Sequence, residues 1–320
     1  MNSYNNPLIT IGIPSFNHEK FITKMLYSIY NQTYKNIELI IVDDCSDDNT
    51  YLCCENFLKQ YSDRFVSVTL LKNNKNCGTA LTLNKILKLV KGCFFVYLSS
   101  DDVISKELIS TEVKYLLNDP TAVLVVPDSL FIDNKGNHLY CDVNRNFFKG
   151  SLPEGEYFRT FSTFYNFHRN NIFKSSTFGS LETLLQGNYI PNGYMIRSEK
   201  LAIIEFTKKS PLEDYYLMLN LSLFGHFIFI NKPLFLYRIH DNNISKNIKR
   251  MKKITQITLY YFLRKNFFVL CSMFYLQDDH SLLRKILMYL IDLKLNVVIC
   301  ALIPNFVFRK FRRKIIKNIK

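Results

Sequence analysis

Two short apolar segments of this chain each lead into a pair of aspartates. Asp43 and Asp44 directly follow the first segment, and Asp101 and Asp102 follow the second after two serines. The two segments are Ile37–Val42 and Cys93–Leu98. Adjacent carboxylates bind divalent cations and accept hydrogen bonds from ligands. Helix capping is the alternative role for each pair, because aspartate also caps helices.

The elements that must position these acids alternate between strand and helix over the first 127 residues. Apolar runs rich in β-branched residues predict strands, and apolar residues three and four positions apart predict helices. The predicted strands are residues 8–13, 37–42, 66–71, 93–98 and 122–126, and the predicted helices are 18–30, 49–61, 78–90 and 105–117. This alternation is typical of an α/β fold with a mainly parallel sheet. Ligands bind at the carboxyl ends of such strands, where both aspartate pairs lie.

The pattern changes after residue 127. A hairpin is predicted around Asn134–Gly136, and residues 145–190 are aromatic and rich in loop-forming residues. The later predicted elements are a strand at 190–197, a helix at 211–224, strands at 227–230 and 234–239, and helices from 247 onward. The sequence therefore predicts one large domain, residues 1–245, followed by a basic α-helical C-terminal segment, residues 246–320.

The net charge of +14 is concentrated in that C-terminal segment, which holds 17 Lys and Arg against 3 Asp and Glu. Within it, Phe308, Phe311, Ile315 and Ile319 form an apolar stripe among basic residues. A basic amphipathic helix of this kind binds an anionic membrane surface. Packing of the stripe on the domain is the alternative. Nucleic acid is not an expected partner, because the basic residues do not extend to the acidic strand ends.

The eight cysteines show no CxxC pair and no metal-ligand spacing. Several lie inside apolar runs, and buried free thiols fit a reducing cytosol. With the basic tail, this predicts a cytoplasmic protein, peripheral on the inner face of the cytoplasmic membrane.

Six separate motifs together resemble the family 2 glycosyltransferases with the GT-A fold, over roughly residues 7–245. They are Ile13–Asn17 with Asn31–Thr33, Val42–Thr50, Asn76–Gly78 with Asn84, Ser99–Asp102, Glu213–Tyr215 and Tyr237–Ser245. The resemblance implies a Rossmann-like core and an inverting transfer of a sugar from a nucleotide-sugar to an acceptor hydroxyl. It assigns residues 1–127 to the nucleotide-sugar and residues 128–245 to the acceptor.

The resemblance also implies a donor pocket. Asp44 would accept a hydrogen bond from the base, and a carboxylate suits an imide N–H such as that of uracil, so a UDP-sugar is expected. The donor-binding residues it implies are Pro14, Ser15, Phe16, Asn17, Asp44, Gly78, Asn84, Asp101 and Arg238. Many relatives carry Arg just before the position of Asn84, where this chain has Leu83.

A divalent cation, Mg²⁺ or Mn²⁺, is the cofactor that the resemblance implies. Ser99 replaces the first acid of the common Asp-x-Asp-Asp pattern, which leaves Asp102 as the expected direct ligand. Asp101 would contact the ribose or a metal-bound water, and His240 would face the diphosphate or the metal. The other histidines show no metal-ligand spacing.

Glu213 and Asp214 open the helix predicted at 211–224. The resemblance assigns the general base to Asp214, with Glu213 positioning the acceptor or the metal. The alternative is a role at the helix N-terminus, where carboxylates are favoured electrostatically.

The expected acceptor is a glycan or a lipid-linked saccharide of a bacterial surface polysaccharide, such as O-antigen or capsule. Two alternatives remain open. A sugar-nucleotide nucleotidyltransferase should show a glycine-rich phosphate loop after the first strand, where this chain has Pro14–Asn17. The other alternative is a non-catalytic partner in a polysaccharide assembly complex.

Overall fold

The computed structural model describes residues 6–276, except 151, 153, 203, 242, 244 and 245 and the side chains of 267, 268 and 271–276. The amphipathic segment predicted at 306–320 lies outside these residues. The chain divides into two compact units, the first ending at Thr258 and the second beginning at Leu259. The sheet and the candidate site belong to the first unit, which is described here by itself.

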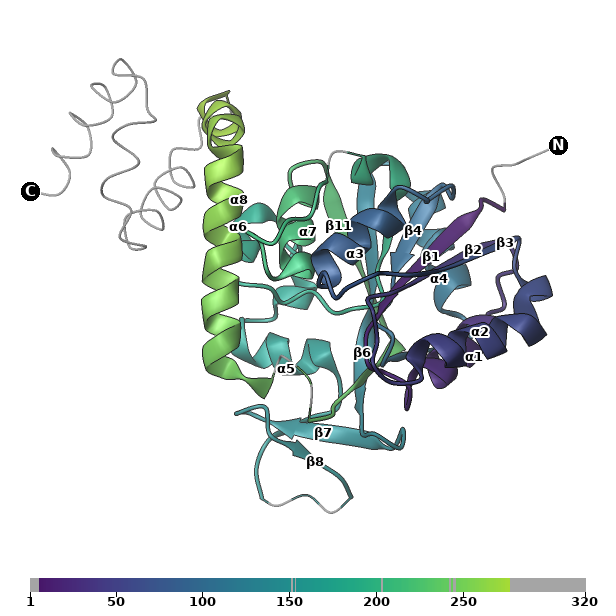
Figure 1. Ribbon diagram of the computed structural model, residues 1–320. Helices are drawn as coiled ribbons and strands as arrows, with labels where there is room; N and C mark the ends of the chain where they lie inside the picture. Colours follow the sequence, from purple (N-terminus) through teal and green to yellow (C-terminus); the bar gives the residue numbers. More distant parts are fainter. Residues whose placement is uncertain are drawn as a thin grey trace, which may run out of the picture. The chain divides into compact units, whose positions relative to one another are not determined.

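A mostly parallel sheet forms the centre of this unit (Figure 1). Its main path runs in the order β3 (Ser67–Lys72), β2 (Ile37–Asp43), β1 (Ile9–Ser15), β4 (Phe94–Tyr97), β10 (Met195–Arg197), β6 (Ala122–Ile132), β11 (His226–Arg238) and β5 (Val103–Ile104). The first four strands are parallel to one another. The predicted α/β class is therefore confirmed.

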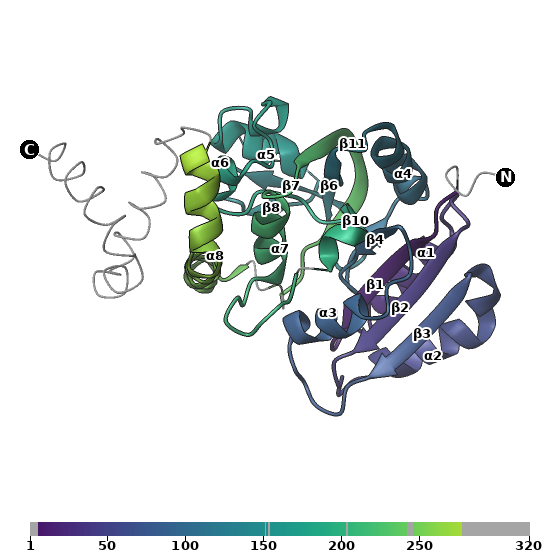
Figure 2. The ribbon, with the colours of Figure 1, turned by 90° about the horizontal axis from the view of Figure 1, so that it is seen from above.

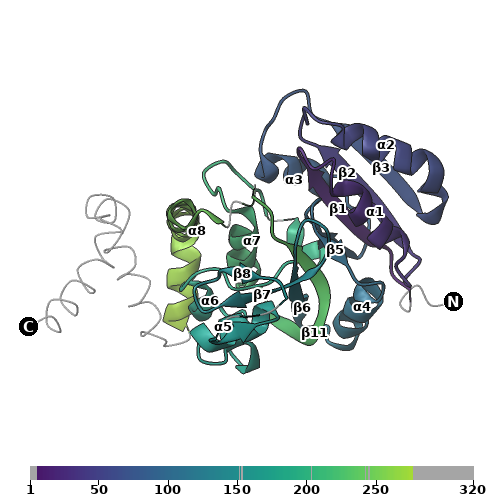
Figure 3. The ribbon, with the colours of Figure 1, turned by 90° about the horizontal axis from the view of Figure 1, so that it is seen from below.

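Helices cover both faces of the sheet (Figures 2 and 3). On one face, α1 (Ile22–Tyr30), α2 (Thr50–Tyr61) and α4 (Leu108–Asn118) share a core with the β1 side chains of Ile11 and Ile13. On the other face lies α3 (Thr79–Leu87), which packs on β1 and β2. Gly12 allows this close approach, because a Cβ there would lie 2.6 Å from Ile86 Cγ2 and 2.6 Å from Phe95 Cε2. Successive strand residues face opposite sides of a sheet, so Gly12 and its neighbours serve different faces.

The direction of the strands brings distant segments to one edge. β10 is antiparallel to both β4 and β6, and β11 is parallel to β6. The carboxyl ends of β1, β2, β4 and β11 therefore all lie at the same edge of the sheet. The loops that follow these four strands carry Asn17, Asp44, Asp101, Asp102 and His240, five of the residues expected from the sequence to bind donor or metal.

The second half adds shorter elements around this sheet. They are β7 (His138–Asp142), β8 (Phe147–Phe148), β9 (Tyr157–Phe158), α5 (Phe161–His168), α6 (Leu181–Leu184), α7 (Glu213–Leu221) and the single-turn 3₁₀ helices Ile172–Lys174 and Ser198–Leu201, whereas a further 3₁₀ turn, Ser62–Arg64, follows α2 in the first half. The predicted hairpin is present between β6 and β7, with the Asp133 carboxylate accepting from the Lys135 and Asn137 main-chain N–H groups.

Two predicted strands differ from the observed ones. The strand predicted at 190–197 is only β10, because Pro191 lacks an N–H for the ladder and Gly193 has a φ of +81°. The strands predicted at 227–230 and 234–239 form one strand, β11, whose register against β6 shifts on both sides of Pro233.

Helix α8 (Ile248–Leu276) contains the boundary between the two units. Its first turn is capped by Asn247, whose side chain accepts from the Arg250 N–H at 2.9 Å. In the part of the chain that the structure describes, no helix combines the length and the apolar character that a membrane crossing requires.

Candidate active site

The loops after β1 and β2 hold each other in place. Asn17, which has a φ of +53°, accepts from the Asp47 N–H through its side chain and donates its own N–H to Ser46 Oγ. Asp43 accepts from both the N–H and the hydroxyl of Ser46. Through these hydrogen bonds, Asn17 and Asp43 hold the two loops together. Of the neighbouring residues expected at the donor, Pro14 and Ser15 are buried in β1, and Phe16 is exposed.

Asp44 organises the loop before α3. Its Oδ1 accepts from Asn73 Nδ2 at 2.6 Å and from the Cys77 N–H at 2.9 Å, and its Oδ2 accepts from the Gly78 N–H at 2.7 Å. Gly78 has a φ of +87°, a conformation that favours glycine. A carboxylate has about four lone-pair positions, so three bonds leave room for one further donor such as a base N–H.

Asn84 connects the two halves. Its amide donates to the Phe206 carbonyl at 2.7 Å and accepts from the Phe206 N–H at 2.9 Å. The side chain expected beside the donor is therefore occupied with the main chain of the second half. Leu83, the residue before Asn84, is buried in the core.

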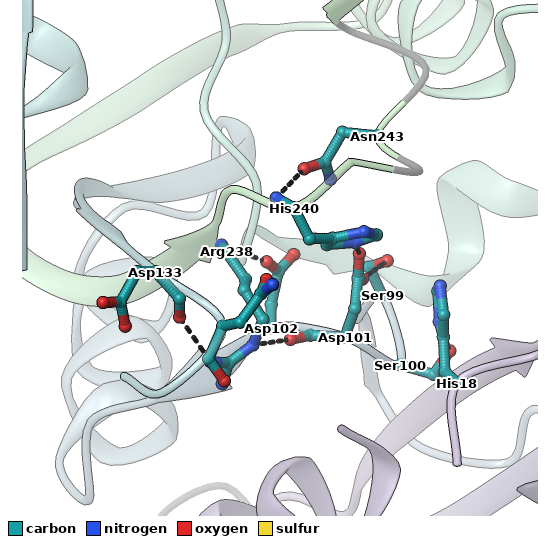
Figure 4. Close-up of polar contacts among 10 residues, drawn as sticks. His18, Ser99, Ser100, Asp101, Asp102, Asp133, Arg238, His240 and Asn243 are labelled. Atoms are coloured by element: carbon teal, nitrogen blue, oxygen red, sulfur yellow. Dashed lines mark hydrogen bonds and ion pairs between the residues drawn. The ribbon is translucent and has the colours of Figure 1, made fainter. Parts of the chain in front are cut away.

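A cluster of two histidines and one aspartate lies beyond β4 and β11 (Figure 4). His240 Nε2 is 2.8 Å from Asp101 Oδ2, and His18 Nδ1 is 2.7 Å from Ser100 Oγ. Asp101 also accepts from Ser99 Oγ. Burial by itself would raise the pKa of Asp101, but the hydrogen bonds from His240 and Ser99 and the charge of His18 outweigh it and lower this pKa. Asp101 is thus a carboxylate at neutral pH.

Asp102 lies deeper. Its Oδ1 accepts from the Arg238 main-chain N–H at 2.8 Å, and its Oδ2 is buried with no hydrogen-bond partner among the described residues. Burial and the charge of Asp101 raise the pKa of Asp102 well above its usual value. The Arg238 side chain is fully buried, and it donates to the main-chain carbonyls of Asp101, Asp133 and Asn134. Arg238, expected at the donor, supports the Asp101–Asp102 turn through these hydrogen bonds.

These residues fit a divalent cation. One ligand atom each from His18, Asp101 and His240 lie within 4.8 Å of one another. The unpartnered Oδ2 of Asp102 is a second oxygen that a cation would satisfy. Carboxylate oxygen and imidazole nitrogen are ligands that Mn²⁺ accepts, and carboxylate suits Mg²⁺. Asp101, rather than the expected Asp102, is the acid within the three-residue group.

A second pair of acids begins α7. Glu213 and Asp214 are partly buried, Tyr97 O–H donates to Glu213 Oε1 at 3.4 Å, and Asn188 Nδ2 donates to Asp214 Oδ2 at 3.1 Å. Burial raises the pKa of both acids, and the charge of Asp214 raises that of Glu213 further. A pair poised in this way can accept a proton near neutral pH.

Tyr97 relates this pair to the metal-site cluster. It ends β4, and its pKa is raised by burial and then by the charges of Glu213, Asp214 and Asp101, among others. The two groups of acids therefore lie around one tyrosine at the carboxyl edge of the sheet. His18, Tyr97 and Asn188 were not expected from the sequence. For His18, the available signal was its position one residue after Asn17, at the end of the first strand.

The sequence profile of glycosyl transferase family 2 matches residues 10–179, more than half of the chain. The protein therefore belongs to glycosyl transferase family 2.

Several curated proteins are related to it. It is 26% identical over 240 residues to the glycosyltransferase GlyG of Streptococcus pneumoniae, covering 75% of this chain and 73% of GlyG. It is 36% identical over 137 residues to an uncharacterized glycosyltransferase of Rickettsia prowazekii, covering 42% of this chain and 41% of the relative. TuaG of Bacillus subtilis, named for teichuronic acid biosynthesis, is 30% identical over 111 residues, covering 35% of this chain and 42% of TuaG. The chain thus spans less than half of the last two relatives.

Solved glycosyltransferases share the fold. S. aureus TarS in complex with UDP superposes with a TM-score of 0.53 at 18% identity, covering 81% of this chain and 72% of that structure. The mannosyltransferase PcManGT from Pyrobaculum calidifontis, in complex with GDP-Man and Mn²⁺, superposes with a TM-score of 0.54 at 17% identity, covering 89% and 85%. The predicted GT-A fold is confirmed.

Proposed function

We propose that this chain is an inverting glycosyltransferase that moves a sugar from a nucleotide-sugar to an acceptor hydroxyl. The observation that carries the proposal is the arrangement around Tyr97, which donates to Glu213 of α7 and whose pKa is also raised by the charge of Asp101, the partner of His240. An inverting transfer needs a base on one side of the anomeric carbon and charge stabilisation on the other. The two groups of residues supply these two functions.

In the proposed reaction, Asp214 accepts the proton of the acceptor hydroxyl while the oxygen of that hydroxyl bonds to the anomeric carbon. The bond from that carbon to the β-phosphate oxygen breaks, and the nucleoside diphosphate leaves with the electron pair. Asn188 holds the Asp214 carboxylate by its 3.1 Å hydrogen bond, and Glu213 positions the acceptor. One carboxylate within hydrogen-bond reach is enough for this proton transfer.

A Mg²⁺ or Mn²⁺ ion bound by Asp101 and His240 would offset the negative charge of the leaving diphosphate, and the unpartnered Asp102 Oδ2 would accept from a water bound to that ion. Asp44, Gly78 and the Pro14–Asn17 loop would line the base pocket. UDP is the proposed nucleotide, supported by the fold shared with TarS, whose structures contain UDP and UDP-GlcNAc.

The proposed acceptor is a glycan, such as a lipid-linked saccharide of a bacterial O-antigen or capsule. The relationship to TuaG, named for teichuronic acid biosynthesis, supports a polysaccharide product. The first turns of α8 carry four exposed basic residues, Lys249, Arg250, Lys252 and Lys253. Exposed basic residues attract anionic lipid surfaces, which supports a place on the inner face of the cytoplasmic membrane.

The test is a donor screen with the purified full-length chain. UDP-, GDP- and dTDP-sugars are supplied with Mn²⁺, with and without a polyprenyl diphosphate saccharide, and both nucleoside diphosphate release and the anomeric configuration of the product are measured. We expect one donor class to be turned over faster with acceptor present, giving an inverted product. A retained configuration, or no turnover of any donor by a folded protein, would refute the proposal.

A further inference from the structure

We propose that His18 is a third protein ligand of the divalent cation, so that this chain binds Mn²⁺ before the nucleotide-sugar arrives and prefers it to Mg²⁺. The inference rests on the proposed function in one respect only, because it concerns the cation of the same site. It adds to Asp101 and His240 a ligand from near the N-terminus of the domain sequence.

The position of His18 is fixed by its main chain and by its ring. Its N–H donates to Thr50 Oγ1 at 2.7 Å, and the preceding Asn17 is held in the left-handed conformation by the β2 loop. The ring nitrogen Nδ1 is 2.7 Å from Ser100 Oγ, in the loop that also carries Asp101. Two anchors on two different loops therefore set the direction of this ring.

The three side chains converge from separate strand ends (Figure 4). The rings of His18 and His240 meet edge to face, with centroids 5.8 Å apart, and the candidate ligand atoms of the three residues lie within 4.8 Å of one another. Asp101 and His240 are buried, and His18 is partly buried. His18 is thus the least buried of the three candidate ligands.

The hydrogen bond to Ser100 also selects the ligand atom. With Nδ1–H donating to the Ser100 hydroxyl, the lone pair of Nε2 is left for a metal. A metal-bound histidine usually donates its other ring N–H to a neighbouring acceptor, which fixes the tautomer and the orientation of the ring. Ser100 is itself buried, so this acceptor is held in place.

Two imidazoles and one carboxylate determine which ion is preferred. Imidazole suits transition metals, whereas Mg²⁺ favours oxygen ligands and keeps several waters. A site with a single aspartate needs diphosphate oxygens to complete the coordination of its ion. Three protein ligands remove that requirement, so the ion binds without nucleotide and Mn²⁺ is favoured over Mg²⁺.

The experiment uses the full-length chain after treatment with a chelator. Mn²⁺ is titrated in the absence of any nucleotide, and the free ion is followed by its electron paramagnetic resonance signal. We expect one tight site per chain, a dissociation constant raised at least about tenfold in His18→Gln and about 10- to 100-fold in Ser100→Ala, and displacement by Mg²⁺ only in large excess. His138→Gln, which changes an exposed histidine of β7, should bind Mn²⁺ like the wild type.

A spectroscopic measurement makes the result independent of the folding of any variant. Electron spin echo modulation of the Mn²⁺-loaded wild type should show ¹⁴N coupling from two imidazoles, and His18→Gln should show one. A single coupled imidazole in the wild type, or an unchanged dissociation constant in folded His18→Gln, overturns the inference.

The two proposals fail in different ways. Turnover of a nucleotide-sugar by a wild-type chain that binds no Mn²⁺ on its own overturns the inference and leaves the proposed function standing. Nucleotide-independent Mn²⁺ binding through two imidazoles, with no donor turned over, supports the inference and refutes the proposed function.

Discussion

The main-chain N–H of Arg238, the last residue of β11, donates to Asp102 Oδ1 at 2.8 Å across 136 positions of sequence. The Arg238 side chain then donates to the carbonyl of Asp101 at 2.6 Å. One residue of the second half therefore fixes both acids at the end of β4. The site is assembled only when the last strand joins the sheet.

The first prediction concerns the stability that depends on Arg238. Arg238→Met should lower the free energy of unfolding by about 3–5 kcal/mol, because it removes a buried cation that faces buried acids and three carbonyls. Urea denaturation measures this change. Arg159→Met, at an exposed position, should change the stability by less than about 0.5 kcal/mol. Equal stabilities of the two variants would contradict the structural role of Arg238.

The second prediction concerns the general base. Asp214→Asn should lower kcat by about 10²- to 10⁴-fold, because the amide cannot accept the proton of the acceptor hydroxyl. Donor affinity, measured by calorimetry, should stay close to that of the wild type. Glu55→Gln, which alters an exposed carboxylate of α2, is the matched control. A kcat within a factor of two of the wild type in folded Asp214→Asn would exclude this residue as the base.

The third prediction is the pH dependence of the transfer. Burial raises the pKa of Asp214 to about 6 and, together with the charge of Asp214, that of Glu213 to about 7. The base works in its unprotonated form, so the rate should rise with pH, by up to about tenfold per pH unit below pH 6, and become level above pH 7. The profile of kcat/KM between pH 5 and 9 measures this. A rate that is constant from pH 5 to 8 would show that no group with a raised pKa limits catalysis.

The fourth prediction concerns Glu112, a buried acid of α4 away from the site. Burial raises its pKa well above the usual 4.5, with the Met195 N–H partly opposing the shift. The folded state therefore holds this proton more tightly than the unfolded chain does. The stabilisation is fully present below pH 4.5 and is lost as the pH rises toward the folded-state pKa, by at most about 1.4 kcal/mol per pH unit.

Glu112→Gln tests this relation. The variant should lose that component of the pH dependence, so the stability difference between Glu112→Gln and the wild type should grow in favour of the variant as the pH rises. Urea denaturation at several pH values above 4.5 measures it. Glu55→Gln should follow the wild-type curve, and a Glu112→Gln curve parallel to the wild type would refute the prediction.

The sequence was most informative about the site where a strand leads into acidic residues. Asp44 and Asp101 follow apolar runs whose parallel arrangement brings their carboxyl ends to one edge, so their placement follows from local pattern and strand direction. The partner of such a residue is harder to predict. His18 lies 82 positions before Ser100 and 222 before His240, and no spacing within the chain indicates that these side chains meet.

Local sequence patterns were least informative where a strand runs antiparallel to its neighbours. β10 is antiparallel between two parallel strands and has three residues, so its hydrophobic pattern is too short to define its bounds. The sequence favoured Asp102 as the direct metal ligand, whereas Asp101 is the acid that lies with His18 and His240 in the structure. The position of Asp102 depends on a residue far along the chain, because its Oδ1 accepts from the Arg238 N–H.

Asn84 imitates a strand residue with its side chain, because its amide forms both main-chain hydrogen bonds of Phe206. Aspartate lacks the donor and alanine lacks both groups, so neither replacement can keep both hydrogen bonds. In an evolving lineage, the nucleotide-binding half could therefore not be exchanged freely for that of a relative. A chimaera would keep this connection between the two halves only if the incoming helix presented an amide at this position.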